Sequence, residues 1–406
     1  MKKLFLFILL ISQLSSFGQL SDNSILIGTR DTIMSSVLGE ERSYWVYLPS
    51  SYRTKQSHRR FPVVYLLDAD VHFHSVTGLL HQFTSGVNGN DLFPEMIVVG
   101  ILNTNRTRDL TPSQVQSDNN GNLAFQYKTG GAASFLSFLN NELIPKIDRQ
   151  YYTTPYRMLV GHSFGGLFVL NTLLNRPEQF TSFLAIDPSV SWDNAYLLKD
   201  AEKLLQAKDF SGKRLFIGIA NTMPPGITFR NVSRDSSANT FHIRSIKKFI
   251  ALLQKATVKK TLKSSWEYYE NEDHGSVPLI ATYNALHFFF DGYRMSQPIA
   301  LGGVDLISKH FKAVSQLMGY DILPPETRIN QIGYYLLRSG QVDKALEYFA
   351  FNTRNYPNSA NAFDSMADGY LKKGETKKAK ECFEKAIELD PENQIYKKKL
   401  SDIISK

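Results

Sequence analysis

The sequence predicts an α/β protein with a mostly parallel sheet, followed by a smaller all-helical region. Two observations lead to this prediction. From about residue 43 to residue 293, short apolar segments alternate with amphipathic ones, as in strands joined by crossover helices. After residue 295 the apolar strands stop, and particular residues recur at a constant interval.

The first region contains seven apolar or aromatic segments predicted as strands and six amphipathic segments predicted as helices. The predicted strands are 44–49, 62–68, 95–102, 157–161, 182–187, 214–220 and 264–270, and the predicted helices are 75–85, 131–148, 165–175, 194–207, 240–255 and 277–292. The first strand and the segment before it are expected to form an antiparallel edge. Polar stretches at 86–91 and 103–130 interrupt the pattern, and the longer one is expected to be a functional loop or lid.

The interval in the second region is 34 residues. The matching pairs are Gly333 and Ala367, Gly340 and Gly374, Ala345 and Ala379, Phe349 and Phe383, and Pro357 and Pro391. Small residues where two helices touch, large ones in the gaps and a proline after the second helix are typical of tetratricopeptide repeats. Because two such repeats rarely hold together alone, helices near 305–318 and 393–405 are expected to cap them.

The first residues have the pattern of a secretory signal peptide. Two lysines precede the apolar run 4–11, and small residues at 16 and 18 suit a cleavage site. We therefore expect a signal peptide at 1–18 and a periplasmic or secreted location, followed by a domain at 19–298 and a repeat domain at 299–406. The alternative is that this segment is the first core element. No later segment has the length of apolar sequence that predicts a transmembrane helix.

Composition narrows the function classes. The 406-residue chain has a formal charge of +8, which suits an acidic ligand or an anionic surface, and its single cysteine, Cys382, allows no internal disulfide. The sequence has no P-loop, no zinc-ligand spacing and no basic cluster with interleaved aromatics. We therefore predict no nucleic-acid partner and no metal site.

The segment 161–165 has the pattern G-x-S-x-G between a predicted strand and a predicted helix. In a nucleophile elbow, this strained turn presents a serine hydroxyl above the sheet, and the glycines avoid a clash with the neighbouring backbone. Ser163 is therefore the predicted nucleophile, with an ordinary tight turn as the alternative. We place the oxyanion hole at two backbone N–H groups, those of Phe164 and of Asp70 in the loop after strand 62–68.

The general base is expected on a loop after the last strand, because in this arrangement the order along the chain is serine, acid, histidine. His274 has this position, and Gly275 gives its ring room to swing over the sheet. His162, next to the nucleophile, is interpreted as a packing residue. His242 lies inside a predicted helix and is interpreted as structural.

The sequence leaves the triad acid open. Asn221 follows strand 214–220, where an acid commonly stands. Asp235 is the first carboxylate after that strand and is our preferred candidate. Asp187, at the end of strand 182–187, and Asp273, beside the histidine, are alternatives, and so is a Ser–His dyad without an acid.

Two further side chains are candidates for substrate binding. Arg108 could face the cleft and bind an acidic substrate, or it could anchor the loop through ion pairs that also involve Arg106 and Asp109. Trp192, after the sixth strand, could line the acyl or alcohol pocket, or it could belong to the core.

Taken together, these motifs resemble the esterase D and enterochelin-esterase-like family of α/β-hydrolases, which includes periplasmic siderophore esterases. The resemblance spans roughly residues 25–295 and is carried by FPVVYLLDAD (61–70), NTNRTRDLTP (103–112), GHSFGG (161–166), IDPSVSWDN (186–194) and EDHGSVP (272–278). It implies an α/β-hydrolase fold and cofactor-free hydrolysis of carboxylic esters by Ser163 and His274. Ala69 departs from the family pattern, which usually has glycine there.

The predicted function is that of an exported serine esterase with a Ser–His(–Asp) acyl-enzyme mechanism, acting on an ester such as that of a siderophore. Two alternatives remain: a peptide- or protein-binding module with an inert hydrolase domain, and an acyltransferase on the same fold. The repeats are expected to recruit a protein partner or to mediate self-association.

Overall fold

The computed structural model describes residues 25–53, 59–86, 90–115, 129–255 and 261–405. The predicted signal peptide and residues 116–128 of the predicted loop at 103–130 lie outside this part of the chain. Within the described part, no helix combines the length and the apolar character needed to cross a bilayer.

An eight-stranded sheet with the order β1-β2-β4-β3-β5-β6-β7-β8 forms the centre of the first region. The first pair and the β2–β4 pair are antiparallel, and all other pairs are parallel, as the sequence predicts. The strands are β1 (Thr29–Ser35), β2 (Glu40–Tyr47), β3 (Phe61–Leu66), β4 (Ile97–Ile101), β5 (Thr153–His162), β6 (Ser182–Ile186), β7 (Lys213–Ala220) and β8 (Leu262–Tyr269). Every residue of β3, β4 and β6 is buried, because helices cover both faces of the sheet.

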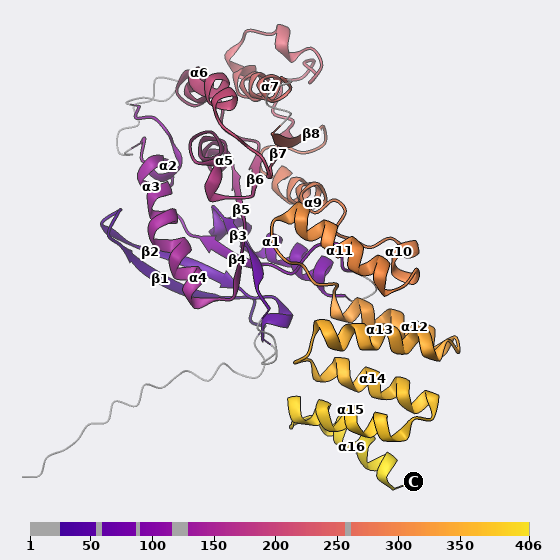
Figure 1. Ribbon diagram of the computed structural model, residues 1–406. Coiled ribbons are helices and arrows are strands. Elements are labelled where there is room, and N and C mark those ends of the chain that lie inside the picture. Colours follow the sequence, from indigo (N-terminus) through magenta and orange to yellow (C-terminus); the bar gives the residue numbers. More distant parts are fainter. Residues whose placement is uncertain (1–24, 54–58, 87–89, 116–128, 256–260, 406) are drawn as a thin grey trace, which may run out of the picture.

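Helices cover the two faces of the sheet in separate groups (Figure 1). One face packs against α3 (Ala132–Phe138), a π-helical turn (Leu139–Leu143), α4 (Ile144–Gln150), α5 (Phe164–Asn175), α6 (Trp192–Ala207) and α7 (Phe241–Leu253). The other packs against α1 (Ala69–Thr84) and α9 (Val277–Phe289). The short helix α2 (Arg106–Leu110) belongs to the loop after β4.

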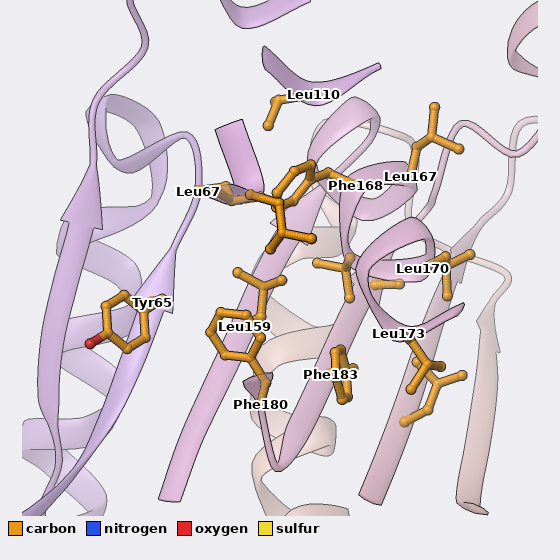
Figure 2. Close-up of a cluster of buried hydrophobic side chains, with 14 of the residues drawn as sticks. Tyr65, Leu67, Leu110, Leu159, Leu167, Phe168, Leu170, Leu173, Phe180 and Phe183 are labelled. Carbon is orange, nitrogen blue, oxygen red and sulfur yellow. The ribbon is translucent and has the colours of Figure 1, made fainter. Parts of the chain in front are cut away.

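Helix α5 is the best-buried helix of the sheet domain and fixes the position of the elbow. Figure 2 shows its side chains Leu167, Phe168, Leu170 and Leu173 in the same buried cluster as Leu159 and Phe183 of the central strands. All four helix side chains are fully buried. At about 2 kcal/mol for each buried side chain, this contact holds the helix, and therefore the turn at its N-terminus, firmly on the sheet.

Helix α1 begins at Ala69, earlier than the predicted start at residue 75. Asp68, the residue just before the helix, has a left-handed backbone conformation, so the turn after β3 leads straight into α1. The first turn exposes Asp70 and the apolar Val71, so the apolar periodicity of the sequence becomes visible only later in the helix.

The C-terminal region is entirely helical within the described residues and contains a stack of antiparallel helices (Figure 1). Its helices are α10 (Gln297–Leu301), α11 (Val304–Met318), α12 (Glu326–Arg338), α13 (Val342–Asn355), α14 (Ala360–Lys373), α15 (Thr376–Leu389) and α16 (Gln394–Ile404). A Cβ atom on Gly333 would lie 2.4 Å from the ring of Phe349, so the 34-residue repeat places its small residues where helices touch. The helix pairs α12–α13 and α14–α15 form the two repeats, with α11 and α16 beside them as predicted.

The helical stack shares a hydrophobic core with the α1 and α9 face of the sheet. The ring of Tyr156 on β5 lies 5.5 Å from that of Phe290 and 5.9 Å from that of Tyr320. The hydroxyl of Tyr348 on α13 donates to the carbonyl of Ala300 at 2.8 Å. The two predicted domains are therefore continuous in their packing, although the sequence divides them at residue 298.

Candidate active site

Three neighbouring parallel strands end in residues with strained backbones. Asp68 after β3, Ser163 after β5 and Asp187 after β6 are non-glycine residues with φ angles of 52°, 60° and 37°. Such conformations cost about 1–3 kcal/mol each and persist where the surrounding structure enforces them. Because the carboxyl ends of adjacent parallel strands meet at one edge, the three residues mark a single candidate site.

The turn at Ser163 is a nucleophile elbow in its geometry. The serine precedes α5 with φ 60° and ψ −115°, and its N–H donates to the carbonyl of Ile186 at 2.9 Å. A Cβ atom on Gly161 would lie 2.4 Å from the backbone of Gly165, so only glycine fits there. The hydroxyl oxygen of Ser163 lies 3.3 Å from that of Ser189, on the turn after β6.

His274 reaches the same edge of the sheet from the loop after β8. Its ring lies 4.4 Å, between centroids, from that of His162, the residue before the nucleophile. Its Nδ1 atom lies 2.5 Å from Oδ2 of Asp187. Because a carboxylate only accepts, His274 presents Nδ1–H to it, and this fixes the tautomer in which Nε2 is the basic nitrogen.

The carboxyl group of Asp187 is fully buried and ionised. Burial by itself would raise the pKa of Asp187, but the hydrogen bonds and charges of His242 and His274 outweigh burial and hold it well below its usual value. The second carboxylate oxygen, Oδ1, accepts the N–H of Ala220 at 3.1 Å. The acid is therefore held rigidly in the state that can orient and stabilise an imidazolium ion.

The structure does not bring Asp235, the acid preferred from the sequence, to the histidine. The Asp235 carboxylate accepts bonds from Ser237 and Thr240 at the start of α7, and these bonds lower its pKa. Nor does Asp273 reach Nδ1, since its carboxylate accepts the backbone N–H groups of Gly275 and Ser276. Of the three carboxylates considered from the sequence, Asp187, which the sequence kept only as an alternative, is the one that the structure places at Nδ1 of His274.

The segment after β7, where the acid commonly stands in this fold, makes structural hydrogen bonds instead. The N–H of Asn221 donates to the carbonyl of Glu272 at 2.8 Å, and its side chain donates to the carbonyl of Glu270 at 3.0 Å. Asn221 therefore ties this loop to the loop that carries His274, and the carboxylate at His274 belongs to Asp187 after β6, one strand nearer to the elbow.

Two other histidines contact the site. His242, interpreted from the sequence as structural, places Nε2 at 3.1 Å from Oδ2 of Asp187. His162 packs between His72 and His274, with ring centroids 5.6 Å and 4.4 Å away. Burial and the two neighbouring imidazoles lower the pKa of His162 to about 4, so it stays neutral. No local pattern distinguishes His242 from other helical histidines.

The predicted oxyanion donors lie at two helix N-termini beside the elbow. Phe164 is the first residue of α5 and Asp70 is the second residue of α1, and N–H groups at these positions have no acceptor within the helix. A Cβ atom on Gly165 would lie 3.2 Å from the carboxylate of Asp68, so the β3–α1 turn touches the elbow.

Arg106 clamps the two turns together. Its Nε and Nη2 atoms donate to the two carboxylate oxygens of Asp68 at 2.6 and 2.9 Å, and Nη2 also donates to the carbonyl of His162 at 3.2 Å. The guanidinium carbon lies 5.4 Å from the centroid of the Phe164 ring. This bidentate pair holds both proposed N–H donors in a fixed relation.

Comparison with known proteins shows the family of the chain. A model of the putative esterase family matches residues 35–242. The chain belongs to this esterase family. A tetratricopeptide-repeat model matches residues 360–393, within the helical stack. The family and the fold are those that the sequence motifs predict.

Relatives of this esterase-family chain include siderophore esterases. The ferri-bacillibactin esterase of Bacillus subtilis is 31% identical over 195 residues, which are 46% of this chain and 66% of that protein. The siderophore triacetylfusarinine C esterase of Aspergillus fumigatus is 28% identical over 185 residues, which are 43% of this chain and 60% of that protein. The chain thus spans less than two thirds of the length of these two relatives. The crystal structure of an IroE-like serine hydrolase from Shewanella oneidensis is 30% identical and has a TM-score of 0.69, and the match covers 80% of this chain and 99% of that one.

In the esterase domain Arg108 is engaged by the protein itself. Its guanidinium bonds both carboxylate oxygens of Glu40 and donates through Nε to Asp109 at 2.7 Å. The Asp109 carboxylate also accepts a bond from the buried Arg42 at 2.6 Å. This is the anchoring alternative, because Arg108 ties the loop after β4 to β2 rather than facing a cleft.

Trp192 lies at the start of α6 and contacts Phe164, the residue after Ser163. Its ring packs edge-on against that of Phe164 at 5.1 Å, and its indole N–H donates to the hydroxyl of Ser113 at 3.0 Å. In the esterase domain this side chain is therefore placed to form an apolar wall near Ser163.

Among the described residues of the esterase domain, Asp187, His242 and His274 are close enough together to be considered as metal ligands. The separation of 2.5 Å between Nδ1 of His274 and Oδ2 of Asp187 is a hydrogen-bond distance. Two ligand atoms that each lie about 2.0–2.1 Å from a tetrahedral zinc ion are about 3.3 Å apart. The arrangement fits a hydrogen-bonded relay better than a metal site.

Proposed function

We propose that the chain hydrolyses carboxylic esters with Ser163 as nucleophile, His274 as general base and Asp187 as the orienting acid. The single observation that carries this proposal is the bond between Nδ1 of His274 and the buried Asp187, beside a serine held in an elbow. Membership of the esterase family and the siderophore esterases among its relatives support it.

The proposed reaction follows from the placement of these groups. Ser163 Oγ attacks the ester carbonyl carbon while Nε2 of His274 takes the hydroxyl proton, and the ionised Asp187 stabilises the imidazolium. The imidazolium then protonates the leaving alcohol, and water hydrolyses the acyl-enzyme with His274 again acting as base. The N–H groups of Phe164 and Asp70 stabilise the oxyanion, each by about 3 kcal/mol.

In the structure the hydroxyl of Ser163 lies 3.3 Å from that of Ser189, and it is not in the orientation for proton transfer to His274. A rotation of the Ser163 side chain towards the imidazole precedes attack, since hydrogen bonds of resting active sites often tighten only when substrate binds. Trp192 and Phe164 form the apolar wall against which the acyl or alcohol part of the substrate lies.

The first test is hydrolysis of p-nitrophenyl butyrate by the purified protein, together with labelling by a fluorophosphonate probe. We expect Ser163→Ala to abolish both, while Ser233→Ala, an exposed serine on another loop, leaves both intact. A Ser163→Ala protein that hydrolyses at the wild-type rate would refute the nucleophile. An unlabelled wild-type protein would instead favour a binding module with an inert hydrolase domain.

The proposed substrate class is a siderophore ester, as the names of two relatives indicate. Ferric catecholate trilactones and hydroxamate esters, compared with p-nitrophenyl esters, would test it by product analysis. Added alcohols in the same assay would detect acyl transfer.

We further propose export through the N-terminal segment, for which the mass of the mature protein would show loss of residues 1–18. Binding of a protein partner by the repeats is also part of the proposal.

A further inference from the structure

The carboxylate of Asp187 serves two histidines at once. Oδ2 lies 2.5 Å from Nδ1 of His274 and 3.1 Å from Nε2 of His242, and Oδ1 accepts the N–H of Ala220. Because an ionised carboxylate only accepts, His242 must present Nε2–H to it. An ordinary triad needs one histidine on the acid, so the role of the second one requires an explanation.

His242 is held rigidly by the helix that carries it. It lies in the first turn of α7, whose residues Ile243, Ile246 and Phe249 are fully buried. The helix start is braced by Asp235, whose carboxylate accepts the hydroxyl of Thr240. The ring of His242 stands edge-on to that of His274, with centroids 6.0 Å apart.

The second donor changes what Asp187 does to the base. A carboxylate that shares one oxygen between two N–H groups stabilises the His274 imidazolium less than one that serves His274 alone. Among the described residues, the other charged or titratable groups that act on these side chains are His162 from the elbow and Asp273 from the His274 loop. On α7 itself, Arg244 donates to Thr240 and to the carbonyl of Ser237, away from the carboxylate.

We propose that His242 is a positioning residue that fixes the orientation of the Asp187 carboxylate and limits its attraction for the His274 imidazolium. This inference rests on the proposed ester hydrolysis. It assigns to His242 a function in holding the Asp187 carboxylate in place and in sharing its negative charge between two imidazole rings.

The inference predicts the effect of removing the donor. Without Nε2–H of His242, Asp187 attracts the His274 imidazolium more strongly, so the base stays protonated to a higher pH. The acidic limb of the kcat/KM profile then moves up by about one pH unit. On the plateau kcat falls about tenfold, because the carboxylate loses one of its three donors and its fixed orientation.

The experiment compares His242→Leu, which cannot donate, with His242→Gln, whose amide can. The exposed His81→Leu on α1 is the matched control. Profiles of kcat/KM and kcat with p-nitrophenyl butyrate are measured from pH 5 to 9, with thermal melts to confirm folding. In His242→Leu we expect the upward shift of the acidic limb of the kcat/KM profile and the tenfold loss of kcat. In His242→Gln we expect kcat and kcat/KM within about twofold of wild type, and in His81→Leu no change in either.

If the His242→Leu protein is folded and the acidic limb of its kcat/KM profile lies at the wild-type pH, the inference is overturned, while the esterase proposal stays intact. If the wild-type protein has no esterase activity, the proposed function fails, and the shared carboxylate is tested without turnover. The titration of the His274 ring by NMR, in Ser163→Ala with and without His242→Leu, should show the same upward shift. Equal midpoints in the two proteins would overturn the inference.

Discussion

Replacement of Asp187 by asparagine is the sharpest test of the site. The carboxylate is fully buried and lies 2.5 Å from Nδ1 of His274. An amide at this position can turn its N–H towards Nδ1, which favours the histidine tautomer protonated at Nε2, and that tautomer cannot take the serine proton. We expect kcat to fall about 10⁴-fold, which corresponds to about 5.5 kcal/mol of transition-state stabilisation.

The matched control is Asp235→Asn, the acid that the sequence alone favours. Its carboxylate bonds Ser237 and Thr240 and does not contact the base, so kcat should stay within about threefold of wild type. Rates of p-nitrophenyl butyrate hydrolysis are measured for both variants, with thermal melts to confirm that each is folded. The assignment of Asp187 fails if Asp187→Asn keeps more than about a tenth of the activity, or if Asp235→Asn loses as much.

Two further predictions concern the elbow. Gly161→Ala places a methyl group 2.4 Å from the Gly165 backbone and should lower the free energy of unfolding by about 3 kcal/mol, whereas Gly78→Ala, in open space on α1, should raise it by about 0.5–1 kcal/mol. Urea denaturation measures both, and equal effects would contradict the packing described for the turn. Because burial lowers the pKa of His162 to about 4, the unfolded chain binds a proton there that the folded chain does not, between pH 6.5 and 4. The free energy of unfolding should therefore fall on acidification through this window, by no more than about 3 kcal/mol, and His162→Asn should reduce the fall; an identical pH dependence in the variant would refute this.

The features that could be predicted from the sequence are local. The elbow needs glycines at fixed distances from Ser163, and a Cβ at Gly161 meets the backbone only four residues away. The repeats can be recognised in the sequence because positions where helices touch recur after 34 residues, as at Gly333 and Ala367. His274 could be chosen as the candidate base because it stands between the last strand and the following helix.

The acid could not be chosen in this way, because it depends on contacts between distant segments. Asp187 and His274 are 87 residues apart, and nothing near either one distinguishes Asp187 from Asp235. The pairing of His162 with Ile186 across β5 and β6 decides the choice, since it sets the carboxylate directly beside the elbow. Likewise, Arg108 meets Glu40 only because the loop after β4 folds back onto β2.

The sequence alone therefore determined the family, the order of strands and helices and the repeat, and it selected Ser163 and His274 as candidates, since each of these features depends on residue spacing along a short stretch of chain. The tertiary structure decided which carboxylate contacts His274, that His242 contacts the same carboxylate, and that the helical stack continues the core of the sheet domain. These depend on strand order and register, which bring together residues that no local pattern connects.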